Sequence, residues 1–462
     1  MRGINEKCAV IGVSNTRDFD VARLVYLGLW SLQHRGQDSS GIASYDGVKL
    51  HVHKKGGLVS QVYDEGSLAS LKGQVAIGHN RYSTSGGKDD AYNQPYFYIS
   101  INFAFAHNGN LPFTDKLEEY LLHHDISHDG YNDTGLMSLA LRTELKKTKS
   151  IEKAVKNCWP LFTGAFSCVA LYEDTMFAFR DSFGIRPLVL GKTSHGYVVA
   201  SETVALDIIG ADFIRDIAPG ELVCIKGEEL ISSQITKGEE KIDAFEFVYL
   251  ARPDSRIAGM SVYTTRYKAG RELAKVSKVE ADVVIATPDS GISAATGYAH
   301  ESGIPLEFGL LKNRYIGRTF IEPEKIRKNS VELKFNVIVE SVAGKKVILV
   351  DDSLVRGNTL KYVIGLLKSY GAKEVHVRIA SPPIKYPDFY GIDTPKNNDL
   401  IASEYSEDEI TQIIKADSLE FLALEPFIKS TGLPKSRLNL SSFNGVYPIP
   451  VPITANAQNN SD

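Results

Sequence analysis

One segment near residue 350 constrains the fold more than any other part of the chain. Lys345–Val350 is a largely apolar run typical of a buried strand, and Asp351 and Asp352 follow it directly. A short loop with a glycine and hydroxyl side chains comes next, and a helical pattern covers Thr359–Tyr370. A strand, a loop and a helix in this order are typical of a parallel sheet, which binds ligands at the carboxyl ends of its strands. Backbone N–H groups of such a loop and helix N-terminus favour an anion.

The two acids beside this predicted anion site restrict the ligand. Carboxylates repel a phosphate unless they face another part of the same molecule, and they suit ribose hydroxyls or a divalent metal. Phosphoribosyl pyrophosphate has this layout, and Val347–Thr359 closely resembles the signature of the type I phosphoribosyltransferases. The resemblance implies that Asp351 and Asp352 contact Mg²⁺ or the ribose diol, without deciding which. The other residues that it implies for substrate binding are Ser353, Val355, Arg356, Gly357, Asn358 and Thr359.

Two further segments are expected at the same sheet edge. Ala286–Gly291 again follows a strand and precedes a helix, and the resemblance makes Ser290 a metal-associated residue. Residues 312–319 place three cations around a glycine in a predicted loop. Such a loop is suited to close over a pyrophosphate leaving group and to exclude water. Its predicted substrate-binding residues are Lys312, Arg314 and Arg318.

The strand and helix patterns differ between the two halves of the chain. After the polar stretch Ser232–Lys241, predicted to be a linker or an exposed loop, strands at Val283–Ala286 and Glu374–Ile379 alternate with helical patterns such as Ser290–Ser302. This alternation indicates βαβ units. The first half has helical spacing at 18–33 and 134–147 and many short strands, which predict antiparallel sheets. These strands are Cys8–Val13, Val75–Gly78, Phe103–Ala106, Ala165–Leu171, Phe177–Phe179, Val198–Ala200 and Leu222–Ile225.

A second candidate site surrounds Cys8. Alone, a cysteine before an apolar strand is more often a small buried hydrophobe. Together with Ser31–Ile42, Gly78–Gly86 and Ala106–Asn110, in this order, it resembles the class II glutamine amidotransferases, which use an N-terminal nucleophile. The resemblance implies that Asn108 and Gly109 form the oxyanion hole. The residues that it implies for binding or bracing at glutamine are Arg35, Arg81, Thr84 and Asp133.

The position of Cys8 predicts proteolytic processing. In these enzymes the α-amine of the first residue, with a pKa near 8, serves as the base for its own thiol, and an amide nitrogen cannot. Seven residues precede Cys8. We therefore expect self-catalysed cleavage of the Lys7–Cys8 bond, which makes residues 1–7 a propeptide.

Both halves together resemble the amidophosphoribosyltransferase family over nearly the whole chain. The expected fold is a four-layer αββα N-terminal-nucleophile hydrolase domain (8–235) followed by a parallel-sheet phosphoribosyltransferase domain (236–435). Residues 436–462 form a C-terminal extension whose last residues are expected to be disordered. Further segments that match the family are 181–188, 200–203 and 249–255, the last of them expected at the domain junction.

The family implies a two-part reaction. Glutamine is hydrolysed at the thiol, and the ammonia passes to phosphoribosyl pyrophosphate to give 5-phosphoribosylamine, glutamate and pyrophosphate, which opens purine synthesis. It also implies one Mg²⁺ per subunit, inhibition by purine nucleotides, and a homo-oligomer, a dimer or tetramer. One branch of the family carries an iron–sulfur cluster. We expect none here, because no cysteine follows Cys224.

Composition limits the partners and the compartment. The net charge of -4 provides no basic footprint for nucleic acid or for an anionic membrane. No apolar run approaches the roughly 20 residues of a membrane span. Met1–Lys7 is too short and polar for a signal peptide. Four cysteines in 462 residues make no disulfide framework, which favours the cytoplasm.

Three alternatives differ in the use of the two sites. A sugar-phosphate aminating enzyme or an asparagine synthetase shares the first site but needs another acceptor domain in place of the Val350–Thr359 loop. A non-catalytic sensor of phosphoribosyl pyrophosphate leaves the Cys8 segments unexplained, and the acidic balance disfavours DNA binding. An enzyme that uses only free ammonia results if the propeptide is retained.

Overall fold

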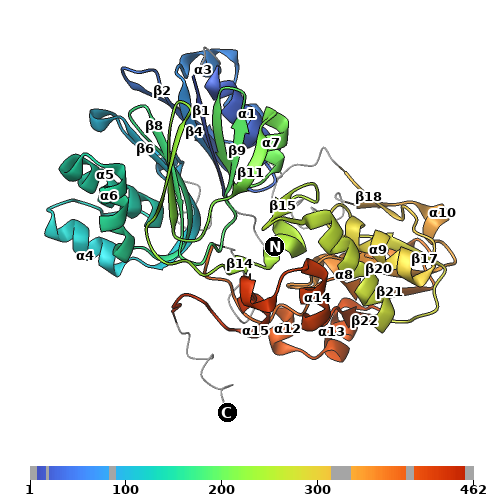
Figure 1. Ribbon diagram of the computed structural model, residues 1–462. Coiled ribbons are helices and arrows are strands. Elements are labelled where there is room, and N and C mark those ends of the chain that lie inside the picture. The colour runs from blue at the N-terminus through green and yellow to red at the C-terminus, as the bar shows by residue number, and fades with distance from the viewer. Residues whose placement is uncertain (1–7, 17–19, 83–89, 314–334, 392–399, 453–462) are drawn as a thin grey trace.

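The computed structural model describes residues 8–16, 20–82, 90–313, 335–391 and 400–452. Figure 1 shows two bodies side by side, the first half of the chain in blue to green and the second in yellow-green to red. The predicted propeptide, residues 1–7, and the C-terminal tail from residue 453 lie outside the described residues.

The first body contains two antiparallel sheets. In the seven-stranded sheet the order is β11-β9-β10-β1-β4-β2-β3. Its strands are β1 (Ala9–Asn15), β2 (Ser39–Tyr45), β3 (Leu50–Gly56), β4 (Val75–Arg81), β9 (Val189–Thr193), β10 (Gly196–Ala200) and β11 (Asp212–Asp216). In the six-stranded sheet the order is β13-β12-β8-β7-β6-β5. Its strands are β5 (Tyr96–Tyr98), β6 (Phe103–Phe113), β7 (Thr163–Tyr172), β8 (Thr175–Arg180), β12 (Glu221–Lys226) and β13 (Glu229–Gln234).

Helices cover the outer face of each sheet and produce four layers. One core joins the seven-stranded sheet to α1 (Val21–Ser31), α2 (Val59–Val62), α3 (Glu65–Ser70) and α7 (Val204–Ile209). Another joins the six-stranded sheet to α4 (Asp115–His123), α5 (Asp133–Thr148) and α6 (Ile151–Cys158). Alternate residues of the strands, such as Val10 and Val169, fill a third core between the sheets. This arrangement confirms the predicted αββα domain.

The second body is built on a parallel sheet of order β17-β20-β21-β22. Its strands are β17 (Val283–Ala286), β20 (Lys346–Asp351), β21 (Glu374–Ile379) and β22 (Ser418–Phe421). One face packs against α8 (Val262–Val276), α9 (Ile292–Ser302) and α14 (Leu424–Thr431). The other packs against α11 (Asn358–Ser369) and α13 (Glu407–Ile414). The first and last residues predicted for β17 and for β21 agree with the structure. Each strand is buried along its length except for one end residue.

Short elements complete the described part of the second body. The helical ones are α10 (Val339–Val342), α12 (Ile401–Glu404), α15 (Ser441–Asn444) and a π-helix η4 (Glu246–Leu250). The paired short strands are β14 (Ile242–Asp243) with β23 (Leu438–Asn439), β15 (Arg256–Ile257) with β16 (Met260–Ser261), and β18 (Leu310–Lys312) with β19 (Phe335–Val337). Leu438, Leu440 and Phe443 of the predicted C-terminal extension pack into the same core as Phe245.

The predicted linker needs one correction. Ser232, Ser233 and Gln234 belong to β13, which pairs with β12, and only the residues after them form a loop. The polar composition misled the prediction because β13 is an edge strand whose side chains are largely exposed, so apolar residues are not required there. In the described part of the chain, none of the helices combines the length and apolarity needed to span a bilayer.

Candidate active sites

Cys8 lies directly before β1, the central strand that carries it into the first site. Strand β1 pairs with β4 on one side and with β10 on the other. Beyond the end of β10, the Ser201 hydroxyl accepts a hydrogen bond from Val10 N at 2.9 Å, and Ser201 N donates to Val10 O at 3.0 Å. The main chain two residues from the thiol is therefore held firmly.

A pocket of about 300 Å³ opens beside Cys8. It draws its walls from β4, β6, the start of α5 and the loop before β5. The lining residues are Cys8, Arg81, Tyr82, Gln94, His107, Gly109, Asn110, Asn132, Asp133 and Thr134. The structure thus brings together four residues predicted for this site, namely Cys8, Arg81, Gly109 and Asp133.

Asn108 and Gly109 lie in β6 with unusual local features. Asn108 is fully buried, yet neither its side-chain nitrogen nor its oxygen has a hydrogen-bond partner among the described residues. Buried amides are almost always paired in native proteins, so this group is suited to a ligand. Gly109 has a φ of +150°, and a Cβ there would lie 2.0 Å from Ala165 O. Only glycine fits this backbone.

Charges of opposite sign face the pocket. The Asp133 carboxylate, at the first residue of α5, accepts hydrogen bonds from Leu111 N at 3.1 Å and from Thr134 N at 2.7 Å. Arg81 is the last residue of β4, and its guanidinium carbon lies 5.5 Å from the centre of the Tyr92 ring. An acid and a base that are held apart in one pocket match the α-amine and α-carboxylate of a free amino acid.

Gln94 and His107 also line the pocket, although neither is among the residues predicted for this site. Gln94 accepts from His107 N at 2.8 Å, and the His107 ring lies 3.1 Å from Thr134 Oγ1. Burial lowers the pKa of His107, against the opposing effect of Asp133, so its ring stays neutral. His107 stands within the matched Ala106–Asn110 segment. Gln94 follows no pattern that sequence reasoning could use.

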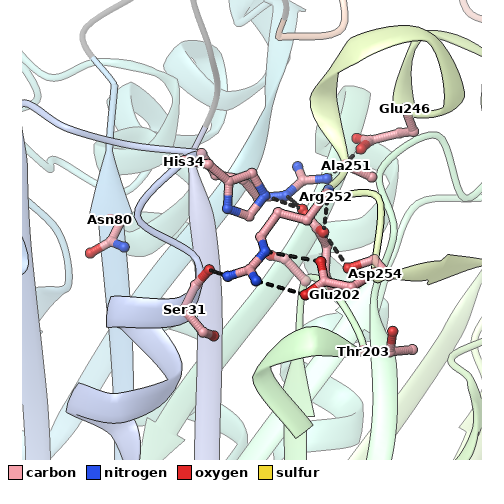
Figure 2. A network of polar contacts seen from close by, with 12 residues as sticks. Ser31, His34, Asn80, Glu202, Thr203, Glu246, Ala251, Arg252 and Asp254 are labelled. Atoms are coloured by element: carbon pink, nitrogen blue, oxygen red, sulfur yellow. Dashed lines mark hydrogen bonds and ion pairs between the residues drawn. The ribbon is translucent and has the colours of Figure 1, made fainter. Parts of the chain in front are cut away.

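Arg35 lies at the junction of the two bodies. Its side chain is 1% exposed and pairs with the carboxylates of Glu202 and Glu246. Figure 2 shows the surroundings of this network, where Glu202 lies beside His34 and Arg252. Arg35 is not among the residues that line the pocket, because two carboxylates at the domain junction already engage its guanidinium. It links Glu202 of the first body to Glu246 of the second.

The predicted junction segment, residues 249–255, lies in the same network. Glu202 accepts hydrogen bonds from Arg252 N at 3.0 Å and from Ser255 Oγ at 2.5 Å. Arg252 also donates to Ser31 O at 3.1 Å, at the end of α1. The prediction of a junction here is confirmed.

The second site begins at the carboxyl end of β20. Asp351 and Asp352 are both buried, and Asp352 Oδ2 accepts from Ser353 Oγ at 2.6 Å. Burial raises the pKa of Asp351 well above its usual range, and the neighbouring Asp352 adds to the shift. Two adjacent buried carboxylates with oxygen ligands to spare suit a hard divalent cation.

The loop after these acids leads into α11, as the sequence predicts. Gly357 occupies the position before the helix with a φ of +77°, where side chains are disfavoured. Asn358 and Thr359 form the first turn and are exposed. Their N–H groups are suited to an anion, because the first N–H groups of a helix have no intrahelical partner.

Residues from other elements lie near this edge. Ser290 and Asp352 line a cavity of about 260 Å³ together with Arg266, which sequence reasoning missed. Arg266 is buried in α8 and donates to Phe247 O at 2.7 Å and to Ala251 O at 2.8 Å. No local pattern distinguishes it from other helical arginines. Lys312, at the end of β18, pairs with Asp289 at 3.1 Å.

Some predicted residues lie outside the described part of the chain. These are Thr84 of the glutamine pocket and Arg314 and Arg318 of the cationic loop. The cysteines other than Cys8 are packing residues, as predicted: Cys158 and Cys168 are fully buried and Cys224 packs beside them.

Comparison with protein families identifies both halves. The model of the glutamine amidotransferase domain matches residues 79–207, and that of the phosphoribosyl transferase domain matches residues 265–382. These ranges contain Arg81, Asn108 and Asp133 in the first site and Ser290 and Asp351 in the second.

Relatives of known name match nearly the whole chain. Amidophosphoribosyltransferase of Mycobacterium bovis is 45% identical over 461 residues, which cover 97% of this chain and 87% of the relative. The Bacillus subtilis enzyme is 42% identical, with 97% and 95% covered. The enzyme of Methanocaldococcus jannaschii is 40% identical, with 96% and 98% covered.

A solved structure agrees over the same length. Glutamine phosphoribosylpyrophosphate amidotransferase from B. subtilis, in complex with ADP and GMP, has a TM-score of 0.89 and 40% identity, and covers 96% of this chain and 98% of that one. Both halves and their order thus match proteins of one kind. The chain belongs to the amidophosphoribosyltransferase family, pentosyltransferases with glutamine amidotransferase activity.

Proposed function

We propose that the two sites divide one reaction, in which ammonia from glutamine displaces pyrophosphate from phosphoribosyl pyrophosphate and gives 5-phosphoribosylamine. This is the first step of de novo purine synthesis. The observation that carries the proposal is the pairing, in one chain, of two sites: a thiol beside a pocket lined by Arg81 and Asp133, and an acid–loop–helix site.

In the first site Cys8 attacks the amide carbon of glutamine. The α-amine of Cys8, exposed after cleavage of the Lys7–Cys8 bond, takes the thiol proton and returns it to the leaving ammonia. Asn108 Nδ2 and the Gly109 N–H donate to the oxygen of the tetrahedral intermediate, and the unpartnered Asn108 amide supports this role. Water then hydrolyses the thioester.

The same pocket selects glutamine by its charged ends. Arg81 binds the α-carboxylate and Asp133 binds the α-amine, as their opposite charges in one pocket suggest. We propose that Thr84 shapes the rest of the pocket. A substrate that lacks either charge forgoes one of these two charge-assisted contacts, which costs affinity.

In the second site the ribose carbon develops positive charge while pyrophosphate leaves. Asp351, Asp352 and Ser290 offer oxygen ligands that fit Mg²⁺, and burial together with the neighbouring Asp352 raises the pKa of Asp351. Bound there, Mg²⁺ neutralises part of the pyrophosphate charge. The N–H groups of Ser353, Val355, Arg356, Gly357, Asn358 and Thr359 bind the 5′-phosphate.

The cations of residues 312–318 act on the leaving group. We propose that Lys312, Arg314 and Arg318 contact the pyrophosphate and keep water from the ribose carbon. The ion pair of Lys312 with Asp289 places one of these charges next to the Ala286–Gly291 loop.

We propose that the protein holds no iron–sulfur cluster, because its cysteines do not supply the ligands. A four-cysteine cluster needs four thiolates in one place. Cys158, Cys168 and Cys224 lie in the core of the six-stranded sheet, and burial raises the pKa of each of these thiols. The purified protein should show no absorption in the iron–sulfur region.

Further proposals concern the setting of the enzyme. The B. subtilis relative was solved with ADP and GMP, and we propose that purine nucleotides inhibit this chain as well. We also propose a homo-oligomer, a dimer or tetramer, in the cytoplasm. Inhibition assays with GMP or AMP in competition with phosphoribosyl pyrophosphate test the proposed inhibition. Light scattering tests the proposed homo-oligomer.

The decisive experiment follows both halves of the reaction. Purified protein is assayed for pyrophosphate release with glutamine and then with ammonia, after intact mass has established whether residues 1–7 are removed. Pyrophosphate release with both nitrogen sources is expected from a chain that begins at Cys8. A correctly trimmed chain that consumes no phosphoribosyl pyrophosphate with either source contradicts the proposal.

A further inference from the structure

A segment of the second half lies directly against Gly109 and Asn110 of β6 in the first site. Asn110 Nδ2 donates a 2.8 Å hydrogen bond to Phe389 O, although the two residues lie 279 positions apart. A Cβ placed on Gly391 would lie 2.9 Å from both the carbonyl carbon and the oxygen of Gly109. The two backbones therefore touch with no side chain between them.

The segment is anchored firmly enough to act as a support. Tyr390 is fully buried, and its carbonyl accepts from Arg186 Nε at 3.2 Å. Its N–H donates to Asp388 Oδ1 at 2.9 Å, and its hydroxyl donates to Ile449 O at 2.5 Å. A packed side chain with hydrogen bonds at three atoms fixes the backbone of its neighbours.

The apolar packing around Tyr390 joins the two halves at the same place. Tyr390 and Ile449 form one buried cluster with Ala165 and Ile185 of the first half. Ala165 is the strand partner of Asn110 in the β6–β7 ladder. The main chain of Gly109 is thus confined between Ala165 O on one side and Gly391 on the other.

We propose that Phe389–Gly391, with Asn110 as its contact, is a positioning element of the glutaminase reaction. It holds the N–H of Gly109 at the angle that the oxyanion requires, so the second half completes the first site. The inference rests on the proposed role of Gly109. Its physical basis is that oxyanion donors act only when they are pre-aligned, and small displacements are costly.

Gly391→Ala tests the proposal in the full-length processed enzyme. The added methyl forces the Gly109 backbone to move, because no flexible side chain is there to yield. The glutaminase kcat is expected to fall about tenfold or more, with KM changed less than about twofold, by analogy with the loss of an oxyanion donor. The ammonia-dependent reaction is expected to stay at the wild-type rate, which also shows that the protein is folded.

Gly371→Ala is the matched control. Gly371 lies in the second half with a φ of +93°, close to the +108° of Gly391, but the nearest atoms to its Cβ belong to Ala343 at 3.6 Å. This variant carries similar backbone strain without the collision. Both of its activities are expected to remain normal. A glutaminase kcat in Gly391→Ala equal to that of this control overturns the proposal.

Asn110→Ala provides a second, independent variant. It removes the hydrogen bond to Phe389 O and should lower the same kcat selectively. Both changes act on the same contact between Phe389–Gly391 and β6. The glutaminase kcat of the double variant should therefore be little lower than that of the worse single variant. A fall equal to the product of the two single effects overturns the proposal. If Gly391→Ala lowers both activities alike, Asn110→Ala decides: a normal glutaminase kcat overturns the proposal, and a selective fall supports it.

Asn108→Ala separates this inference from the proposed function. If Asn108→Ala leaves glutaminase activity intact, the assignment of the oxyanion hole itself is wrong. If Asn108→Ala is inactive with glutamine while Gly391→Ala and Asn110→Ala are normal, only the positioning role of Phe389–Gly391 is overturned.

Discussion

The carboxylate of Glu246 pairs with the guanidinium of Arg35 although the residues lie 211 positions apart, and neither side chain is exposed by more than 1%. Glu246 also lies 3.3 Å from Arg186, and Arg35 also engages Glu202. The junction between the two bodies is therefore a buried network of charges. Burial by itself lowers the pKa of Arg35, but the carboxylates of Glu246 and Glu202 outweigh this effect and raise the pKa above its usual value, so the guanidinium stays charged.

Removing Arg35 should destabilise the protein strongly. Arg35→Met leaves Glu202 and Glu246 buried without their partner, which typically costs about 3–5 kcal/mol. Arg23 is the control, because it also bridges two acids, Asp20 and Glu65, but its side chain is 40% exposed. Arg23→Met should cost far less stability, because solvent screens an exposed ion pair. Urea denaturation measures both, and equal losses in the two variants would contradict the buried network.

Cys8→Ala should separate the two half-reactions. The variant lacks the nucleophile, so glutamine no longer supports pyrophosphate release, while the second site still accepts ammonia at the wild-type rate. Cys224→Ala is the control, because Cys224 packs in the distant core beside the six-stranded sheet. Pyrophosphate assays with each nitrogen source check the prediction, and glutamine-dependent turnover in Cys8→Ala would refute it.

Asp352→Asn should impair the second site with either nitrogen source. Loss of one carboxylate weakens the proposed Mg²⁺ site, and we expect ammonia-dependent turnover to fall by about two orders of magnitude. The Mg²⁺ concentration for half-maximal rate should rise, and glutaminase activity should persist. Asp417→Asn, just before β22 at the opposite end of the sheet, should change neither quantity. An unaltered Mg²⁺ dependence in Asp352→Asn would exclude this residue from the metal site.

Acid should destabilise the first body partly through His79. Burial lowers the pKa of this ring from 6.5 to about 3. The unfolded chain therefore binds the proton first, so stability is complete above pH 6.5 and is lost as the pH falls toward 3. Each pKa unit corresponds to about 1.4 kcal/mol, so the loss amounts to a few kcal/mol.

His79→Gln tests this pH dependence. Glutamine has no proton to gain, so the fall in unfolding free energy between pH 6.5 and 4 should be smaller than in the wild type. His123→Gln, at the exposed end of α4, serves as the control and should follow the wild-type curve. Parallel curves for His79→Gln and the wild type would show that His79 does not contribute.

Elements that depend on local pattern can be predicted from the amino-acid sequence. The bounds of β17 follow from a continuous apolar run and those of β21 from an alternation of polar and apolar residues. The order of acids, glycine and helix after β20 follows from propensities within a dozen residues. Cys8, Arg81 and Gly109 can be predicted together because the segments that contain them match a known class, and the resemblance to that class also implies Asp133. The structure brings the four residues into one pocket.

Contacts between residues that are far apart in the sequence depend on the three-dimensional fold. Periodicity cannot predict that Arg35 binds Glu246 at the domain junction instead of lining the glutamine pocket, or that Phe389 accepts a hydrogen bond from Asn110. Such pairs depend on how two separately folded bodies dock, and docking is set by shape and by the burial of charges over more than 200 positions of chain. Neither the shape of the docking surfaces nor the burial of charges between them can be recognised from the residues next to each partner in the sequence.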